Sequence, residues 1–180
     1  MTKIRRTRLG LEIILWLIFF VALYAFVQWR GSGTAAFPDR LPPIVFQRLD
    51  GQPIVLAPRP GQILWVNFWS PNCPPCLAEL PVLEQVQRLL GGNAFSVLAI
   101  AVPGSSVQEV TQLRHRLGLT FPIYRASSEG NLRKWGGVQL TPTSLLVDAK
   151  GHVVGRFVGP IALPVFFWKL LWIWIRGGWG

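Results

Sequence analysis

The stretch that decides the fold is NFWSPNCPPCLAELP, residues 67–81. It contains the only two cysteines of the 180-residue chain, Cys73 and Cys76, with two prolines between them. An apolar run at 62–69 leads into the pair and is typical of a strand covered on both faces. From 76 to 90, leucine and valine recur at helical spacing, which predicts a helix. The cysteines therefore lie where a buried strand gives way to a helix.

Three kinds of chemistry compete for the cysteine pair. A disulfide across two residues closes almost no loop, so it would stabilise the fold very little. A zinc site needs about four ligands, and the other candidates are His115 and His152, which fall on the polar side of a predicted helix and beside a predicted turn. Dithiol chemistry fits better, because the unpaired N–H groups and the dipole of a helix amino terminus favour the attacking thiolate. Pro74 also suits the first helical position. The pattern favours a redox pair over a structural staple or half of a metal site.

The rest of the domain alternates strands and helices. Two short apolar runs around Asp50 and Gly51 predict a hairpin over 44–56. The elements expected after the first helix are a strand at 95–102, a helix with a Ser106–Glu109 capping box that stops at Gly118, a strand at 120–125, a short helix at 127–137 and two antiparallel strands within 141–159. This order predicts an α/β domain whose mixed sheet has helices on both faces.

Two segments resemble the thioredoxin superfamily, and most of all its membrane-anchored TlpA-like branch, also called ResA-like or DsbE-like. They are VNFWSPNCPPCLAELP at 66–81 and LTPTSLLVDAKGHVVGRFVG at 140–159. The first has the C-x-x-E-x-P arrangement of that branch, and the second is similar to its cis-proline loop and closing hairpin. The similarity covers about residues 40–160. It implies a thioredoxin-like fold with an N-terminal hairpin.

The resemblance also implies roles for single residues. Cys73 would be the exposed nucleophile, Cys76 the resolving thiol, and Pro142 a cis proline that faces the pair. Thr141 would offer its backbone to an extended substrate segment, as in β-augmentation. The expected substrate-binding residues are Thr141, Trp69, Pro74 and Pro75.

The proton acceptor of the site is less plain from the sequence. Thioredoxin itself has a buried acid on the strand before the cysteines, and here that place falls on Asn67. Glu79 is the carboxylate nearest to the pair in the sequence. We expect Glu79 and Asn67 to be the candidates for proton handling; the alternative for Glu79 is a solvated helix residue.

The two ends of the chain carry most of its excess of apolar residues. Hydrophobic residues make up 51% of the chain and nine residues are tryptophan, more than a soluble domain usually contains. A basic tail at 1–8 precedes an apolar stretch at 9–29 that is long enough, as a helix, to cross a membrane. We expect a transmembrane anchor there with its amino terminus in the cytoplasm, a linker at 30–43 and an exported domain at 44–180. A cleaved signal peptide is the alternative to the anchor.

The last segment, PVFFWKLLWIWIRGGWG at 164–180, is apolar on every side of the predicted helix. We expect this helix to pack on the sheet with one side and to rest the other in the membrane interface. The residues expected at headgroup depth are Trp168, Trp172, Trp174 and Lys169. The alternative is a second membrane span.

Taken together, the sequence predicts a single-pass protein of the inner membrane whose extracytoplasmic domain exchanges a dithiol for a disulfide. Reduction is the preferred direction, because the prolines between the cysteines offer no charge to stabilise the thiolate as a histidine would. By resemblance, the partners are disulfide-containing exported proteins or an apocytochrome in cytochrome c biogenesis, and a membrane thiol carrier of the DsbD or CcdA kind. Membrane lipid is a further partner.

Other functions remain as alternatives or are disfavoured. The alternatives are an oxidase or isomerase of the same fold and a non-catalytic binding or chaperone module. A peroxiredoxin-like peroxidase is disfavoured, because the PxxxTxxC setting of that family is absent. We expect no metal and no cofactor other than the Cys73–Cys76 disulfide. Nucleic acid is not expected as a partner either, because the cations behind the net charge of +10 are scattered beyond the first eight residues.

Overall fold

The computed structural model describes most of the chain outside its amino-terminal stretch. The described residues are 12, 14–16, 18, 19, 21, 22, 38–135, 137–161 and 163–175. The chain divides into two compact units, residues 1–34 and 35–180. Among the described residues, no helix is both long and apolar enough to cross a membrane. Most of the predicted anchor at 9–29 lies outside the described residues, so the anchor stays a prediction.

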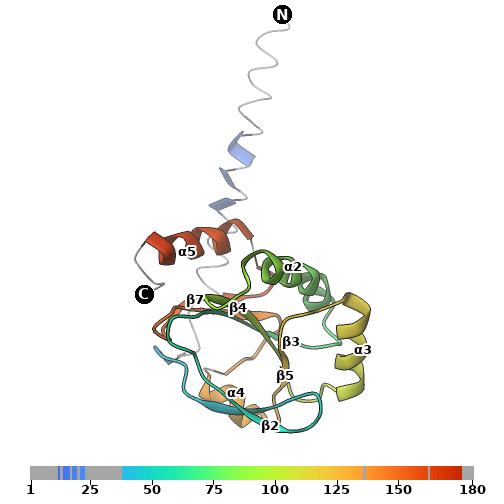
Figure 1. Cartoon of the computed structure of the whole chain (residues 1–180). Helices are drawn as coiled ribbons and strands as arrows, with labels where there is room; N and C mark the ends of the chain where they lie inside the picture. The colour runs from blue at the N-terminus through green and yellow to red at the C-terminus, as the bar shows by residue number, and fades with distance from the viewer. Residues whose placement is uncertain are drawn as a thin grey trace, which may run out of the picture. The chain divides into compact units, whose positions relative to one another are not determined.

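The unit at 35–180 is built on one mixed sheet flanked by helices (Figure 1). In chain order the elements are β1 (Ile44–Gln47), β2 (Pro53–Leu56), β3 (Ile63–Trp69), α2 (Pro74–Leu90), β4 (Phe95–Ala101), α3 (Val107–Leu117), β5 (Ile123–Arg125), α4 (Glu129–Lys134), β6 (Thr143–Val147), β7 (Val153–Val158) and α5 (Leu163–Ile175). The strand order is β2-β1-β5-β4-β3-β6-β7.

The sheet has a parallel centre, β5-β4-β3, with antiparallel strands on both sides, because β1 is antiparallel to both β5 and β2. β3 pairs in parallel with β4, and β4 with β5, whereas β6 is antiparallel to both β3 and β7. β1 and β2 form the predicted hairpin, which turns at Gly51 with φ 83°, a conformation that favours glycine. The predicted mixed sheet is therefore confirmed.

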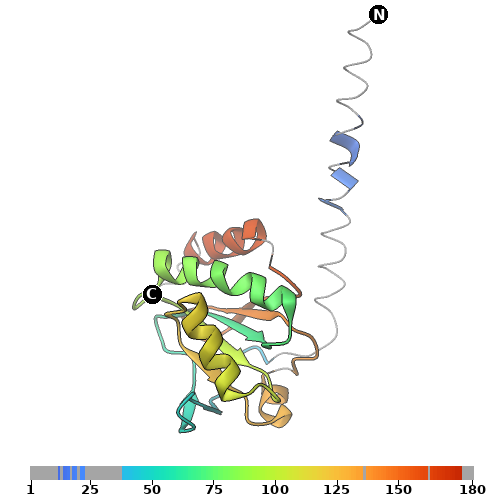
Figure 2. The same cartoon turned by 90° about the vertical axis from the view of Figure 1, so that its right-hand side faces the viewer.

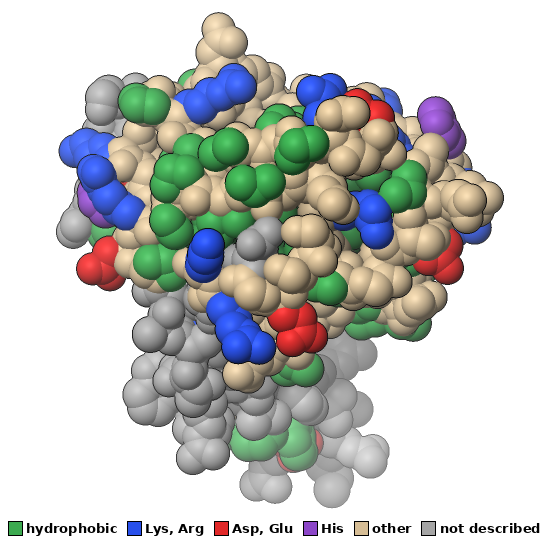
Figure 3. All heavy atoms as spheres, turned by 90° about the horizontal axis from the view of Figure 1, so that it is seen from below, with side chains coloured by type: hydrophobic (Ala, Val, Ile, Leu, Met, Phe, Trp, Pro, Cys, Tyr) green, Lys and Arg blue, Asp and Glu red, His purple; other side chains and the backbone are tan. Residues whose placement is uncertain are grey.

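Both faces of the sheet are covered. Side chains of a strand alternate between its two faces. Trp65 and Trp69 of β3 therefore pack in one core cluster with residues of α2, α3 and α5. Val66 and Phe68 pack on the other face, in a second cluster that includes Leu132 of α4. Figure 2 shows α2, α3 and α5 from the side. The surface on which β2 and α4 lie carries hydrophobic side chains among scattered basic and acidic ones (Figure 3). The prediction of helices on both faces is confirmed.

The helix ends follow the local sequence signals. α2 begins at Pro74, with Cys73 as its N-cap, which is two residues before the start that periodicity predicted. α3 has both hydrogen bonds of the Ser106–Glu109 capping box. It ends at Gly118 in the left-handed conformation with φ 60°. Capping chemistry is local, and for this reason the sequence predicted it well.

α5 packs on the sheet, as expected. The ring of Phe166 stacks on Trp65 with 3.9 Å between the centroids, and Phe166 and Ile173 belong to the buried core. Over its 13 residues, Leu163–Ile175, α5 rises about 20 Å, less than the roughly 30 Å of a hydrocarbon core. The expectation that Lys169 reaches headgroup depth is wrong. Its Nζ turns back to β7 and donates to the carbonyl of Val154 at 3.2 Å.

Candidate redox site

Cys73 and Cys76 form a disulfide at the amino terminus of α2, with 5.2 Å between their Cα atoms. Cys73 is half-buried, whereas only 1% of Cys76 is exposed. The backbone N–H of Cys76 donates to Sγ of Cys73 at 3.3 Å. The first turn of the helix thus directs a hydrogen-bond donor at the more accessible sulfur, an arrangement that stabilises a thiolate there after reduction.

The loop before β6 approaches the cysteine pair from the other side. The peptide bond between Thr141 and Pro142 is cis, as the sequence predicted. The carbonyl oxygen of Thr141 lies 3.5 Å from Sγ of Cys73. Gly159 N–H donates to the carbonyl of Pro142 at 2.8 Å, which ties this loop to the end of β7. The fold therefore brings together two segments that are 68 positions apart in the chain.

A buried polar network connects α2 with β3 and β6. The Glu79 carboxylate is only 8% exposed and accepts hydrogen bonds from Asn67 Nδ2 and from the N–H of Ile161, both at 3.3 Å. Asn67 Nδ2 also donates to Ser144 Oγ at 2.9 Å, and Trp65 Nε1 donates to the same oxygen at 3.0 Å. Glu79 lies three residues after Cys76, hence on the same side of the helix one turn later.

The environment of Glu79 perturbs its acidity. Burial raises the pKa of Glu79, and the hydrogen bonds from Ile161 and Asn67 only partly oppose this effect. The alternative that Glu79 is a solvated helix residue is therefore wrong. A buried carboxyl group with a raised pKa, one helical turn after a buried cysteine, keeps its proton to a higher pH than an exposed one and is a candidate for proton handling.

Comparison with known proteins agrees with this geometry. Residues 38–164, more than half of the chain, match the Redoxin family. The chain belongs to the Redoxin family. The chain is 29% identical to the thiol-disulfide oxidoreductase ResA of Geobacillus thermodenitrificans over 154 residues, which cover 85% of this chain and 87% of that protein. The sporulation thiol-disulfide oxidoreductase A of Bacillus subtilis is 28% identical over 151 residues, covering 81% of this chain and 90% of that protein.

A solved structure leads to the same conclusion about the fold. The thiol:disulfide interchange protein of the thioredoxin family from Chlorobium tepidum superposes with a TM-score of 0.64 and 29% identity. The superposition covers 81% of this chain and 99% of that chain. The redoxin domain therefore has the thioredoxin-like fold that the two sequence segments implied.

The predicted substrate-binding residues differ in accessibility. Pro74 and Pro75 are exposed and Thr141 is half-buried, so all three border the accessible side of the pair. Trp69 is 0% exposed in the core, so the prediction that its side chain binds substrate is wrong. Sequence reasoning missed Leu140, an exposed apolar side chain next to Thr141.

Sequence reasoning also missed two members of the polar network. Ser144 lies in a run of residues that was assigned only to a strand, although a hydroxyl two residues after Pro142 could have indicated a polar residue near the site. Ile161 takes part through its backbone N–H, for which a side-chain pattern gives no signal. Both residues reach the site only because β6 and the segment after β7 fold next to α2.

Open space lies beside the pair. A cavity of about 570 Å³ separates the loop before α2 from α3. Its walls include Pro71, Asn72, Leu77, Gln112 and Arg116. Because Asn72 directly precedes the first cysteine, a polypeptide held at the pair has room on this side of the redoxin domain.

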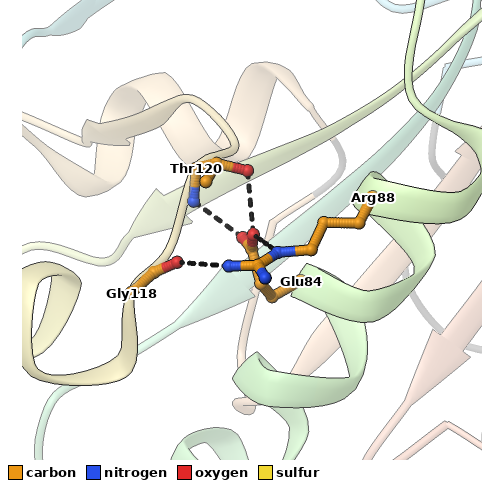
Figure 4. Close-up of polar contacts among 4 residues, drawn as sticks. All are labelled: Glu84, Arg88, Gly118 and Thr120. Carbon is orange, nitrogen blue, oxygen red and sulfur yellow. Dashed lines mark hydrogen bonds and ion pairs between the residues drawn. The ribbon is translucent and has the colours of Figure 1, made fainter.

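A second polar network holds α2 in place (Figure 4). Glu84 accepts from the N–H of Thr120 at 2.7 Å, from the Thr120 hydroxyl at 2.9 Å and from Arg88 Nε at 2.7 Å. Arg88 Nη2 in turn donates to the carbonyl of Gly118 at 3.4 Å. The network fastens the middle of α2 to the connection between α3 and β5.

The two histidines lie apart from the pair. His115 is exposed on α3, while His152 is half-buried after the turn between β6 and β7, where its Nε2 accepts from Arg40 Nε. In the part of the chain that the structure describes, no three His, Cys, Asp or Glu side chains are grouped to hold a metal ion.

Proposed function

We propose that the protein is a membrane-tethered thiol-disulfide oxidoreductase that reduces disulfides of exported proteins. Its homologues are named thiol-disulfide oxidoreductases, and its chemistry is dithiol-disulfide exchange. The observation that carries the proposal is the Cys73–Cys76 disulfide at a helix amino terminus, with the backbone of Thr141 next to its accessible sulfur.

The exchange starts from the reduced pair. The Cys73 thiolate attacks one sulfur of a substrate disulfide, a mixed disulfide forms, and the other substrate sulfur leaves as a thiolate and takes up a proton. The Cys76 thiolate then attacks Sγ of Cys73, which releases the second substrate thiol. Two electrons pass to the substrate, and the protein is left with the Cys73–Cys76 disulfide found in the structure.

The buried Cys76 has to lose its proton before it attacks. Glu79 suits the role of acceptor, because it lies one helical turn further along α2 and has a raised pKa. Asn67 positions the carboxylate through its hydrogen bond to Glu79. In this proposal, Thr141 pairs with the extended backbone of the substrate, and Pro74 and Pro75 contact its side chains.

The cellular setting of the proposal comes from the sequence. The apolar stretch at 9–29 would anchor the chain in the inner membrane with its amino terminus in the cytoplasm and the redox domain on the periplasmic side. Substrates would be exported proteins with disulfides or an apocytochrome. A membrane thiol carrier of the DsbD or CcdA kind would return electrons to the pair, which would serve as the only redox group.

A trapping experiment tests the exchange mechanism. In the full-length chain, Cys76→Ser removes the resolving thiol, so mixed disulfides on Cys73 should accumulate and their partners can be identified by mass spectrometry. Cys73→Ser is the matched control and should trap nothing. A Cys76→Ser chain that captures no more protein than this control would contradict the mechanism.

The direction of electron flow has its own measurement. Equilibration of the pair with glutathione gives its reduction potential, which for a reductase should lie toward the thioredoxin value of about −270 mV. A value near the strongly oxidising end, about −120 mV, would make the protein an oxidant instead.

A further inference from the structure

α5 has a buried side and an exposed side, and both are apolar. Phe166 and Ile173 point into the core. The exposed large side chains follow each other at spacings of one and three residues, which places them on one stripe of the helix. We refer to them as the outer face of α5: Phe167, Trp168, Leu171, Trp172 and Ile175, each 43–70% exposed.

The outer face of α5 carries no charge. Lys169 is the only charged residue in the sequence of this helix, and its Nζ is held inward by the Val154 carbonyl, 5.6 Å from the centroid of the Phe157 ring. Single exposed apolar residues are ordinary on protein surfaces, but five large ones on one uncharged helix face indicate a binding surface.

We propose that the outer face of α5 lies in the headgroup region of the membrane to which the chain is tethered. This contact goes beyond disulfide exchange, although it rests on the membrane location in the proposed function. Tryptophan suits such a position, because its apolar ring enters the boundary of the acyl chains while its N–H remains hydrated. A helix that is apolar on its outer side and packed on a domain on its inner side would bind in the plane of the membrane.

The length of the tether favours lipid as the occupant. The linker at 30–43 can span at most about 50 Å when fully extended. The domain would therefore always stay near the bilayer, and a weak surface contact would be enough to hold it there.

Charge also favours lipid over a second copy of the chain. Residues 44–180 hold twelve Lys and Arg and six Asp and Glu, and this net charge of +6 attracts anionic headgroups and repels an identical domain. In addition, the sequence places Arg176 directly after the helix. A basic residue at the border of an apolar face is typical of helices that rest on anionic membranes.

Space for lipid exists at the border of this face. A cavity of about 220 Å³ opens between α5 and β7. It is lined by Val154, Trp168, Lys169, Trp172 and Ile173. Because four of these five side chains are apolar, the cavity suits part of an acyl chain better than a polar ligand.

Spin labels on the full-length chain test the contact. In a Cys73→Ser/Cys76→Ser background, a nitroxide is attached at Leu171→Cys, and the chain is reconstituted into vesicles of phosphatidylcholine and phosphatidylglycerol. Val55→Cys on β2, also an exposed apolar position at 63%, is the matched control. The label at 171 should be more accessible to oxygen than to a water-soluble nickel chelate, and the label at 55 should show the reverse.

The outcomes separate this proposal from the proposed function. Nickel accessibility at 171 equal to that at 55, or dipolar broadening between labels on two copies, would overturn the membrane contact. Phe167→Cys provides a second labelling position if the first variant fails to fold, as judged by circular dichroism. Insulin reduction by the chain with both cysteines, measured in the same vesicles, reports on disulfide exchange alone. If this chain does not reduce insulin while the label at 171 is embedded in lipid, only the proposed function is refuted.

Discussion

Replacing Glu84 with glutamine should loosen the attachment of α2 to the connection between α3 and β5. Glu84 is only 5% exposed, and its two oxygens accept three hydrogen bonds from Thr120 and Arg88. An amide has a single oxygen, so its NH₂ group must face either the N–H of Thr120 or Nε of Arg88. At least one donor therefore loses its acceptor, and the remaining bonds lose the charge of the carboxylate.

The size of the effect follows from these bonds. A hydrogen bond to a charged group contributes about 1.5–3 kcal/mol. The Arg88 side chain is 63% exposed, so water replaces part of what it loses, and its ion pair contributes about 1 kcal/mol or less. We expect Glu84→Gln to lower the free energy of unfolding by about 2 kcal/mol. For a domain of this size, the Tm should fall by about 4–8 °C.

The effect should depend on pH. Burial tends to raise the pKa of Glu84, but the hydrogen bonds from Thr120 and Arg88 outweigh burial and hold it below its ordinary value. An acid whose pKa is lower in the folded state stabilises the fold above its unfolded pKa, and this contribution is lost as the pH falls through the folded pKa. The difference between wild type and variant should be complete at pH 7 and shrink below about pH 4.

Denaturant unfolding of the full-length chain in detergent, followed by circular dichroism at pH 7 and pH 3, measures both effects. Arg88→Gln is the control: it removes only the exposed partner and should cost less than about 1 kcal/mol. Equal stability of Glu84→Gln and wild type at pH 7, or a loss that stays the same at pH 3, would refute the reasoning.

Three further substitutions test other parts of the structure. The pKa of Glu79 is raised in the fold, so the free energy of unfolding of the wild type should decline as the pH rises from about 4 through that pKa. Glu79→Gln should lack this decline when unfolding curves at pH 4 and 8 are compared. Phe166→Ala should lower the free energy of unfolding by about 3–5 kcal/mol, because the ring is fully buried against Trp65; a loss below about 1 kcal/mol would argue against the docking of α5. Trp135→Phe removes the 2.8 Å hydrogen bond from Nε1 to the Pro42 carbonyl and should cost about 1 kcal/mol in the same unfolding assay, whereas an unchanged stability would show that water replaces this bond.

The sequence alone determined the features that depend on neighbouring residues. The hairpin at Gly51, the capping box of α3 and the start of α2 after Cys73 all follow from local conformational preferences and local hydrogen bonds. The placement of the cysteine pair at a strand-to-helix junction belongs to the same group, because periodicity on both sides defines the junction. Much of the fold, and the identity of the reacting sulfurs, could therefore be predicted.

Only the tertiary structure decided which side chains surround the pair. Asn67 and Ser144 are 77 positions apart, and Glu79 meets the N–H of Ile161 across 82 positions, so no local pattern announces these bonds. The inward turn of Lys169 likewise depends on where β7 lies under α5. Hydrophobic spacing predicts which face of a helix or strand is buried. The partner of a buried polar group depends instead on how distant segments of the chain pack. That packing buries the Glu79 carboxylate, one helical turn after Cys76.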